Sequence, residues 1–455
     1  MLPTRIGALF MEMGTGKSRT AIELGIQRQG RISKIVWFCP VSLKETVRFE
    51  ILKHTDCSAA DVHVFGDKTR AKNLPSCLWH VVGIESMSSS TRVISAVNAL
   101  IDSRAMVIVD ESSYIKGHTA ARTERITYIA SRARYRLILT GTPISQGVVD
   151  LFSQMRFLSP KILGYGSFYS FAANHLEYSE KYPGMIVRSH NTQFLAAKIQ
   201  PYVYQVTKDE CLDLPDKLFE TRYFSMTSTQ RVWYETVKEE ILTECLEDDF
   251  TSLSIFRLFT ALQQIVCGFL NYRPVRKKAM EHHEFSHDRI ATLMDTVTSI
   301  PPEEKVIIWA KYIRDVEGIT AALSREFGAG SIALYHGELN EAKRAGQVER
   351  FRNGARFFVA TPSCGGHGLT LNEAHYVIFY NNGFKYAERL QAEDRNHRIG
   401  QARKVTYIDI QCLDSIDDRI AQALYNKGSV VEEFKREVEK VKSKKGRLKK
   451  LIKSL

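Results

Sequence analysis

Near its start, the chain carries side chains suited to holding a phosphate. Met11-Glu12-Met13-Gly14-Thr15-Gly16-Lys17-Ser18 follows an apolar run and precedes a helical pattern over Arg19–Ile26. Glycines at 14 and 16 let backbone N–H groups close around phosphate oxygens, and the helix N-terminus adds its positive dipole end. We predict that Lys17 reaches the β- and γ-phosphates of a nucleotide and that the Ser18 hydroxyl binds Mg²⁺. Met11 stands where such loops usually begin with glycine, and a glycine turn with a chance Lys-Ser is the alternative.

A pair of carboxylates ends a second apolar run, Val107-Ile108-Val109-Asp110-Glu111. At the carboxyl end of a parallel strand, both would point into the crevice where ligands of open α/β sheets bind. We predict that Asp110 holds Mg²⁺, through water, and that Glu111 polarises an attacking water. The alternative is that the Asp-Glu pair caps the following helix.

The segment Gln391–Gln401 contains two arginines, Arg395 and Arg398, three residues apart. That spacing predicts that they share one helix face. Two guanidinium groups could bind a γ-phosphate as its charge spreads in the transition state. Since they follow Lys17 by about 380 residues, we expect them to belong to another lobe. The alternative is a solvated helix with ion pairs to Glu388 or Asp394.

Thr140-Gly141-Thr142-Pro143 follows the apolar run Leu137–Leu139. Hydroxyl groups there could sense the acidic pair and couple the nucleotide state to another ligand. The alternative is a plain exit from a strand into a turn that contains Gly and Pro.

Short apolar runs alternate with helical patterns in both halves of the chain, which predicts parallel sheets covered by helices on both faces. In the first half the expected strands are Gly7–Phe10, Lys34–Cys39, Trp79–Val82, Met106–Val109 and Arg136–Leu139. In the second half they are Lys305–Trp309, Ser331–Leu334, Arg356–Ala360, Tyr376–Tyr380 and Val405–Ile410.

The middle of the chain has a different pattern. It is irregular from Val149 to Pro215 and becomes long amphipathic helix from Thr227 to Leu270, for example over Gln230–Leu246. We therefore expect an α/β protein of two lobes. Its predicted parts are a first lobe over 1–155, helical protrusions and an inter-lobe link over 156–285, a second lobe over 286–428 and a basic C-terminal helix or tail over 429–455.

Charge favours a polyanionic partner. The 455 residues are 44% hydrophobic and 25% charged, with a net charge of +12 and a pI of about 9.2. Such a surplus is typical of proteins that bind nucleic acid. From Lys435 to Leu455 there are ten Lys or Arg against two Glu. This tail is either an arm that tracks DNA by releasing counterions or a solvated helix that adds solubility.

Several classes of protein are disfavoured. The eight cysteines form no CxxC pair and the histidines have no zinc-ligand spacing, so no zinc site is expected. His397, within the arginine segment, is expected to orient its neighbours. No apolar run reaches about 18 residues and no signal-peptide pattern is present, so we expect no membrane span. The expected location is the cytoplasm or nucleoid, or the host cytoplasm for a viral protein, and the expected state is a monomer.

Together these segments resemble the Swi/Snf-type branch of the superfamily 2 helicases and translocases, in order along nearly the whole chain. The matching motifs are motif I (Glu12–Ser18), Ia (Cys39–Leu43), II (Asp110-Glu111-Ser112-Ser113), III (Leu139–Pro143), V (Gly365–Leu371) and VI (Gln391–Gln401). Motif VI is the most specific match. Motif II has Ser-Ser where Ala-His is commoner. Asp213–Lys217 resembles the segment in which this branch leaves its first lobe.

The resemblance implies two RecA-like lobes with helical protrusions, DNA-stimulated ATP hydrolysis, and ATP and Mg²⁺ as ligands. It implies duplex or branched DNA as the partner, along which such proteins move without fully separating the strands. It places further residues in three groups. Contacts to ATP are expected from Met13, Thr15, Arg19, Gln391 and Gly368. Contacts to the tracked DNA strand are expected from Ser42, Leu43, Glu85, Ser86 and Thr361. Coupling is expected from Thr140, Gly141 and Thr142.

One departure from the family concerns adenine, which a glutamine-containing element upstream of motif I normally holds. About ten residues precede motif I here, and none is Gln, so either the start is truncated or adenine is held otherwise. Two other functions stay open: a strand-separating DNA or RNA helicase, and a non-catalytic nucleic-acid-binding subunit with a degraded ATP site. The intact set of Lys17, Asp110, Glu111, Arg395 and Arg398 favours a motor.

Overall fold

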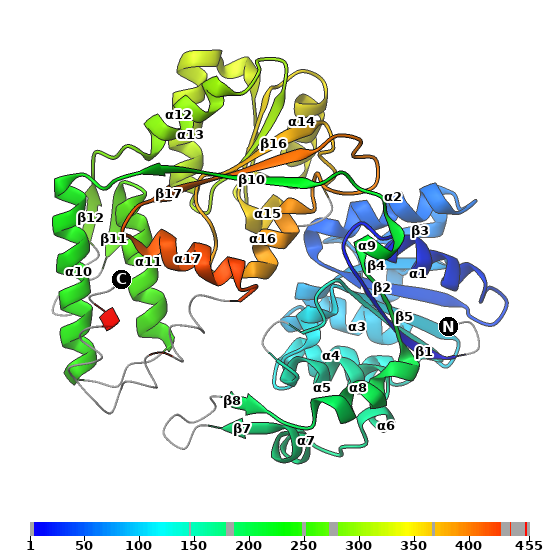
Figure 1. Cartoon of the computed structure of the whole chain (residues 1–455). Helices are drawn as coiled ribbons and strands as arrows, with labels where there is room; N and C mark the ends of the chain where they lie inside the picture. The colour runs from blue at the N-terminus through cyan, green and yellow to red at the C-terminus, as the bar shows by residue number, and fades with distance from the viewer. Residues whose placement is uncertain are drawn as a thin grey trace. The chain divides into compact units, whose positions relative to one another are not determined.

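The apolar runs of both halves form parallel sheets in the computed structural model of the protein (Figure 1). The structure describes residues 4–144, 147–178, 186–247, 252–272, 281–365, 369–428, 437 and 451–452. The chain divides into two compact units, Met1–Asp213 and Leu214–Leu455.

Unit 1 is built on a seven-stranded sheet in which every pairing is parallel. In spatial order the strands are β3 (Val62–Val64), β4 (Trp79–Gly83), β2 (Lys34–Cys39), β5 (Ala105–Asp110), β6 (Tyr135–Thr140), β1 (Ile6–Met11) and β9 (Val203–Val206). Because the strands are parallel, the carboxyl ends of β1, β5 and β6 lie at one edge of the sheet.

Helices cover both faces of this sheet, because successive side chains of a strand point to opposite faces. In β2, Val36 and Phe38 pack into one apolar cluster, while Ile35 and Trp37 pack into another on the opposite face. The second cluster contains side chains of α1 (Lys17–Ile26) and α2 (Lys44–His54). The first contains those of α3 (Thr91–Leu100), α4 (Ala121–Ala130) and α5 (Val149–Leu158).

The rest of unit 1 follows α5. It comprises α6 (Pro160–Leu163), α7 (Phe168–His175), the antiparallel hairpin of β7 (Leu176–Tyr178) and β8 (Ile186–Ser189), α8 (Thr192–Ile199) and α9 (Lys208–Cys211).

Unit 2 is built on a six-stranded sheet, again with parallel pairings throughout. Its spatial order is β10 (Lys217–Phe224), β17 (Val405–Cys412), β16 (Ala374–Phe379), β13 (Lys305–Trp309), β15 (Phe357–Ala360) and β14 (Ile332–Tyr335). The helices that accompany the sheet are α12 (Arg289–Ser299), α13 (Ile313–Phe327), α14 (Glu341–Arg352), α15 (Pro362–Gly365), α16 (Tyr386–Glu393) and α17 (Ile416–Tyr425). The predicted fold of two α/β lobes is therefore confirmed.

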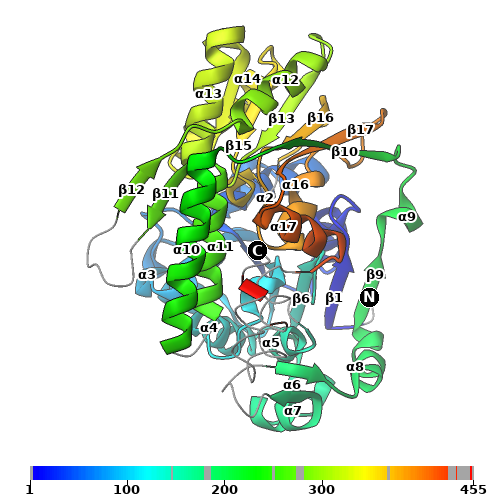
Figure 2. The same cartoon turned by 60° about the vertical axis from the view of Figure 1, so that its left-hand side comes forward.

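A helical insertion precedes α12. Helices α10 (Ser228–Glu247) and α11 (Ser252–Val266) run side by side, followed by the antiparallel hairpin of β11 (Phe269–Tyr272) and β12 (Glu281–Glu284) (Figure 1, Figure 2). The α11 side chains Leu258, Leu262 and Ile265 are fully buried in the same cluster as the sheet residues Val306 and Ile308. The insertion is thus packed into the core of unit 2.

Two strands lie where the sequence predicted helical protrusions and a link. β9 adds an edge strand to the first sheet and β10 adds one to the second. Both strands were missed because an edge strand needs no continuous apolar run. β10 exposes Leu218, Phe219 and Tyr223, and the four residues of β9 are all half-buried or exposed.

In the part of the chain that the structure describes, no helix is both long and apolar enough to span a membrane.

A buried histidine in β4 should make the stability of unit 1 depend on pH. The ring of His80 is fully buried, and this burial, followed by the charge of His63, lowers its pKa to about 4. The unfolded chain binds a proton near pH 6.5, so the stability present above that pH is lost as the pH falls towards 4.

We expect the free energy of unfolding to fall by about 2 kcal/mol between pH 7 and pH 5 through His80. Chemical denaturation at both pH values measures the change. In a His80→Phe variant the free energy of unfolding should depend less on pH. The control His282→Phe changes an exposed position of unit 2 and should keep the pH dependence of the wild type. An equal pH dependence in the wild type and in both variants would show that His80 is not the group responsible.

Candidate functional site: a phosphate loop, an acidic pair and an arginine segment

The loop between β1 and α1 has the backbone that a phosphate needs. Gly14 and Gly16 adopt left-handed conformations, with φ of 81° and 91°, which a side chain would strain. Gly16 is also the N-cap of α1, and no side chain caps this helix end. The first N–H groups of a helix have no partner within the helix, so they are available to an anion.

The Lys17 ammonium group lies across this loop. Its Nζ donates hydrogen bonds to the carbonyl oxygens of Met11 (2.8 Å) and Glu12 (3.0 Å). The Thr15 hydroxyl donates to the Glu12 carbonyl oxygen as well (2.7 Å). The loop is fixed on its other side, because the Glu12 carboxylate accepts a hydrogen bond from the backbone N–H of Lys208 (2.8 Å). Lys17 is thus held at the loop, where it can reach a bound phosphate.

The other predicted contacts of the loop differ in exposure. Met13 and Ser18 are half-buried, and the Arg19 side chain is exposed on the first turn of α1.

Asp110 and Glu111 are both buried, 8% and 7% exposed, where β5 leaves the sheet. Burial, followed by the charge of Glu111, raises the pKa of Asp110 to about 7, against the opposing effect of the Lys17 charge. Glu111 has a left-handed backbone, with φ of 50°, which is uncommon for a residue with a side chain. It precedes the 3-10 turn Ser112–Ile115 but does not cap it with its side chain, so the capping alternative is not observed.

The Glu111 carboxylate has one buried oxygen, Oε2, with no hydrogen-bond partner among the described residues. An unpaired buried acceptor is costly, and such atoms usually serve a water, an ion or a reaction. This atom fits an acidic pair that would hold Mg²⁺ and an attacking water.

The coupling segment Thr140–Thr142 lies directly against the phosphate loop. A Cβ atom on Gly141 would be 3.4 Å from the Met11 carbonyl oxygen and 3.5 Å from the Met13 backbone nitrogen. The fully buried Thr140 hydroxyl accepts a hydrogen bond from the Thr142 N–H (3.1 Å). The structure therefore brings the predicted phosphate loop and coupling segment together.

Two of the segments predicted to contact DNA meet in unit 1. The Glu85 carboxylate accepts a hydrogen bond from the Val41 N–H (2.9 Å), which joins motif Ia to the segment of Glu85 and Ser86. Gly83 permits this approach, because a Cβ there would lie 2.5 Å from the Val41 side chain. The Leu43 side chain is buried in the core, whereas Ser42 and Ser86 are half-buried. Contacts of these segments with DNA stay predictions.

Arg395 and Arg398 come together, though not on a helix as predicted. Helix α16 ends at Glu393, and the residues that follow form turns. Both guanidinium groups nevertheless donate to the same acceptor, the Leu369 carbonyl oxygen, Arg395 at 3.4 Å and Arg398 at 3.1 Å. Arg395 also donates to the Gln391 carbonyl oxygen (2.9 Å) and is 4% exposed, so the alternative of a solvated helix is wrong as well.

The prediction of a helix failed because a buried side chain forms hydrogen bonds with backbone groups of this segment, which competes with helical hydrogen bonding. The Gln401 side chain donates to the carbonyl oxygens of Asn396 (3.1 Å) and Asn372 (3.1 Å). Gly400 then turns the chain with a φ of 97°.

The arginine segment is also tied to the start of unit 2. His397 Nε2 lies 2.8 Å from the Pro215 carbonyl oxygen, and Lys217 Nζ donates to the Glu393 carboxylate (2.7 Å). His397 thus contacts the entry to the second lobe, and its expected role in orienting its neighbours stays a prediction. The residues 215–217, which enter the second lobe, hold the arginine segment from one side.

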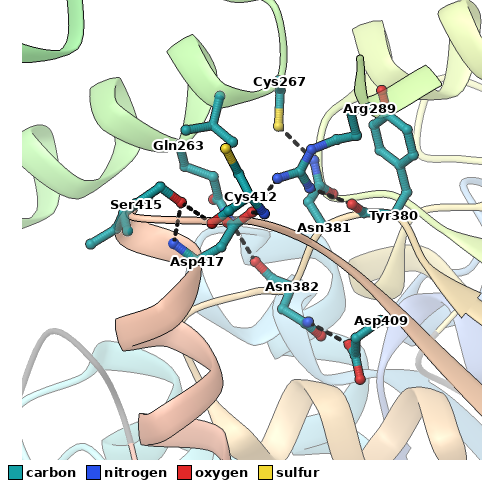
Figure 3. Close-up of polar contacts among 12 residues, drawn as sticks. Gln263, Cys267, Arg289, Tyr380, Asn381, Asn382, Asp409, Cys412, Ser415 and Asp417 are labelled. Atoms are coloured by element: carbon teal, nitrogen blue, oxygen red, sulfur yellow. Dashed lines mark hydrogen bonds and ion pairs between the residues drawn. The ribbon is translucent and has the colours of Figure 1, made fainter. Parts of the chain in front are cut away.

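A buried ion network holds the segment from the other side. Arg389 donates to Glu393 (2.7 Å) and to the side-chain oxygen of Asn382 (2.8 Å), and it forms an ion pair with Asp409. Asn382 in turn accepts a hydrogen bond on its backbone carbonyl from Gln263 of α11 (2.9 Å). Figure 3 shows Asn382 between Gln263 and Asp409. The network therefore reaches from the inserted helices to α16, and no short motif in the sequence reveals it.

The remaining predicted residues divide into two groups. Thr361 is 3% exposed, and its hydroxyl has no hydrogen-bond partner within the described residues. Gly368, predicted to contact ATP, lies outside the described residues, as does most of the basic tail from Lys435.

Two family models match the chain. The SNF2-related domain matches residues 4–283, which is more than half of the chain. The chain belongs to the SNF2-related family. The helicase conserved C-terminal domain matches residues 288–400, which contain Arg395 and Arg398. Relatives that match this chain include two proteins named as ATP-dependent helicases.

Individual relatives of this SNF2-related chain are distant. An uncharacterized ATP-dependent helicase of Mycoplasma genitalium is 25% identical over 71% of this chain and 30% of its own length. The human DNA annealing helicase and endonuclease ZRANB3 is 24% identical over 88% of this chain and 37% of its own length. The chain thus spans about a third of these two curated relatives. The solved SWI2/SNF2 ATPase core of Sulfolobus solfataricus in complex with dsDNA has 23% identity and a TM-score of 0.43, covering 93% of this chain and 87% of that one.

We predict that Arg389 is essential to the stability of unit 2. Its replacement by Met would leave the buried Glu393 and half-buried Asp409 carboxylates without their common cation, which costs about 3–5 kcal/mol. Chemical denaturation of the full chain measures the loss. Arg222→Met, which removes a surface pair with Glu220, is the control and should cost less than about 1 kcal/mol. Similar losses in both variants would contradict a special role for the buried network.

Proposed function

We propose that this chain is a motor that couples ATP hydrolysis to movement along duplex or branched DNA. The observation that carries the proposal is the phosphate loop at the end of β1 together with the buried pair Asp110 and Glu111 at the end of β5, which β6 separates from β1 in the same sheet. Fork or junction remodelling, branch migration and displacement of bound proteins are the outcomes that such movement would produce.

In unit 1 the loop residues would bind the phosphates of ATP. The N–H groups around Gly14 and Gly16 would surround the phosphate oxygens, and Lys17 would exchange its carbonyl partners for the β- and γ-phosphates. Ser18 and Asp110 would hold Mg²⁺, which supplies positive charge to the phosphates. Glu111 would orient the attacking water through its unpaired Oε2.

In unit 2, Arg395 and Arg398 would contact the γ-phosphate. Both guanidinium groups converge on a neutral carbonyl oxygen, that of Leu369. A phosphate is a stronger, charged acceptor, so exchange of one for the other is favourable. A movement of the arginines would then reach residues 215–217 through two contacts, Glu393 with Lys217 and His397 with Pro215.

Two observations support DNA as the track. The net charge is +12, and the human relative ZRANB3 is named as a DNA annealing helicase. We propose contacts to the DNA backbone from Ser42, Ser86 and Thr361 and from the backbone at Leu43, with Glu85 shaping the segment. The basic tail would add affinity that weakens with salt. The chain would work where its track is, in the cytoplasm or nucleoid.

Replacing Lys17 by Ala should reduce ATP turnover to background in the presence of duplex DNA, because the phosphates lose their principal cation. Lys161→Ala, at an exposed position of α6, is the matched control and should turn over ATP like the wild type. Phosphate release measures both. Unchanged turnover by Lys17→Ala would rule out the proposed phosphate loop.

Replacing Arg398 by Ala should lower kcat by about 10³-fold, the scale typical of an arginine finger. Affinity for duplex DNA, measured by fluorescence anisotropy, should change little. Arg325→Ala, exposed on α13, provides the control. If Arg398→Ala weakens DNA binding as strongly as turnover, the side chain acts on DNA and the finger role is wrong.

A further inference from the structure

Gln154, on α5, connects two of the motifs of unit 1. Its side chain is fully buried, and both ends of the amide are used. The Ser112 hydroxyl donates to Oε1 (2.6 Å), while Nε2 donates to the carbonyl oxygens of Pro143 (2.8 Å) and of Asp150 (2.8 Å). Ser112 directly follows Glu111, and Pro143 directly follows Thr142. The Gln154 side chain thus binds the residue that follows the acidic pair and the residue that follows Thr140–Thr142.

The roles of donor and acceptor in this bridge are fixed. The carbonyl oxygens of Pro143 and Asp150 can only accept, so the amide nitrogen must face them and the amide oxygen must face Ser112. Ser112 is itself fully buried. A buried amide that loses one of these bonds pays the cost of an unsatisfied polar group. The bridge therefore resists separate displacement of its two ends.

A second contact joins the same elements. Lys116, just after the turn Ser112–Ile115, forms an ion pair with the buried Asp150 of α5 (3.5 Å). The turn that directly follows the acidic pair is thus attached to α5 at two points, one turn of the helix apart. α5 is the element through which both motifs are held.

We propose that Gln154 is a positioning residue for ATP hydrolysis, which fixes Glu111 relative to the segment Thr140–Pro143. It acts through Ser112 on the carboxylate and through Pro143 on the coupling hydroxyls. A movement of the carboxylates on hydrolysis would therefore move the coupling segment through the Gln154 side chain. The coupling segment lies against the phosphate loop at Gly141. This inference rests on the proposed function of the acidic pair, because it assigns the pair its support.

Three variants separate the two arms of the bridge. Gln154→Met removes both arms at similar volume. Ser112→Ala removes only the bond to the acidic pair. Gln154→Glu keeps an acceptor for Ser112 but loses the donor to Pro143. Gln193→Met, at an exposed position of α8, is the matched control.

We expect Gln154→Met to lower kcat for ATP with duplex DNA about tenfold, because the three buried hydrogen bonds of the amide are lost. KM for ATP should stay within about twofold, since the phosphate loop is intact. Ser112→Ala and Gln154→Glu should each lower kcat by less. The double variant Ser112→Ala/Gln154→Met should resemble Gln154→Met alone, because both changes remove the same bond. Equal effects on kcat and KM, fully additive losses, or an unchanged kcat would overturn the proposal.

Amide hydrogen exchange provides a readout that does not depend on turnover. Gln154→Met should speed exchange in two separate segments, 111–116 and 140–144, whereas Gln193→Met should leave both unchanged. Faster exchange confined to α5 would overturn the bridge. If the wild type hydrolyses no ATP with any nucleic acid, the proposed function fails, and exchange still decides whether Gln154 links the two segments. If Gln154→Met does not fold, Ser112→Ala should speed exchange in 111–116 and Gln154→Glu in 140–144, and no change in either segment would overturn the bridge.

Discussion

Two adjacent carboxylates, Asp110 and Glu111, are buried at the end of β5, a strand in which every residue is buried. Placing two like charges in such surroundings is unfavourable, and the raised pKa of Asp110 reflects that cost. The positive charge of Lys17 offsets part of this cost, because it lowers the pKa of Asp110. A bound Mg²⁺ would lower the cost further. The position of the phosphate loop, the closeness of Gly141 to it and the attachment of Ser112 to α5 all follow from holding this pair at the sheet edge.

Unit 2 meets a different constraint, because two arginines must be held beyond the end of a helix. Glu393 is central to the solution. It accepts bonds from Lys217, at the entry to the unit, and from Arg389, whose partners lead to Gln263 of the inserted helices. The insertion is thus packed with the sheet and also linked by polar contacts to the residues proposed to act on ATP. This arrangement gives a physical route by which a change at the arginines could reach the rest of the unit.

Sequence analysis predicted the central strands well, since Lys34–Cys39 and Lys305–Trp309 are apolar after their first lysine and are buried there on both faces. It missed β9 and β10, whose exposed positions at the sheet edges remove that signal. It identified the phosphate loop and the acidic pair from local spacing, and in the structure the charge of Lys17 in that loop acts on Asp110 of the pair. It was wrong about the helix through Arg395 and Arg398, because hydrogen bonds from the Gln401 side chain to backbone carbonyl oxygens decide that conformation. The role proposed for Gln154 was invisible, since its partners are distant in sequence.

The central claim is that ATP turnover by this chain is governed by a duplex DNA track. The most direct measurement is the rate of ATP hydrolysis with no nucleic acid, single-stranded DNA, duplex DNA, branched DNA and RNA, at one salt concentration. We predict a low basal rate that duplex or branched DNA stimulates most strongly. Stimulation mainly by single-stranded DNA or RNA would contradict a duplex track and favour a strand-separating helicase. Hydrolysis under none of these conditions would contradict a motor altogether.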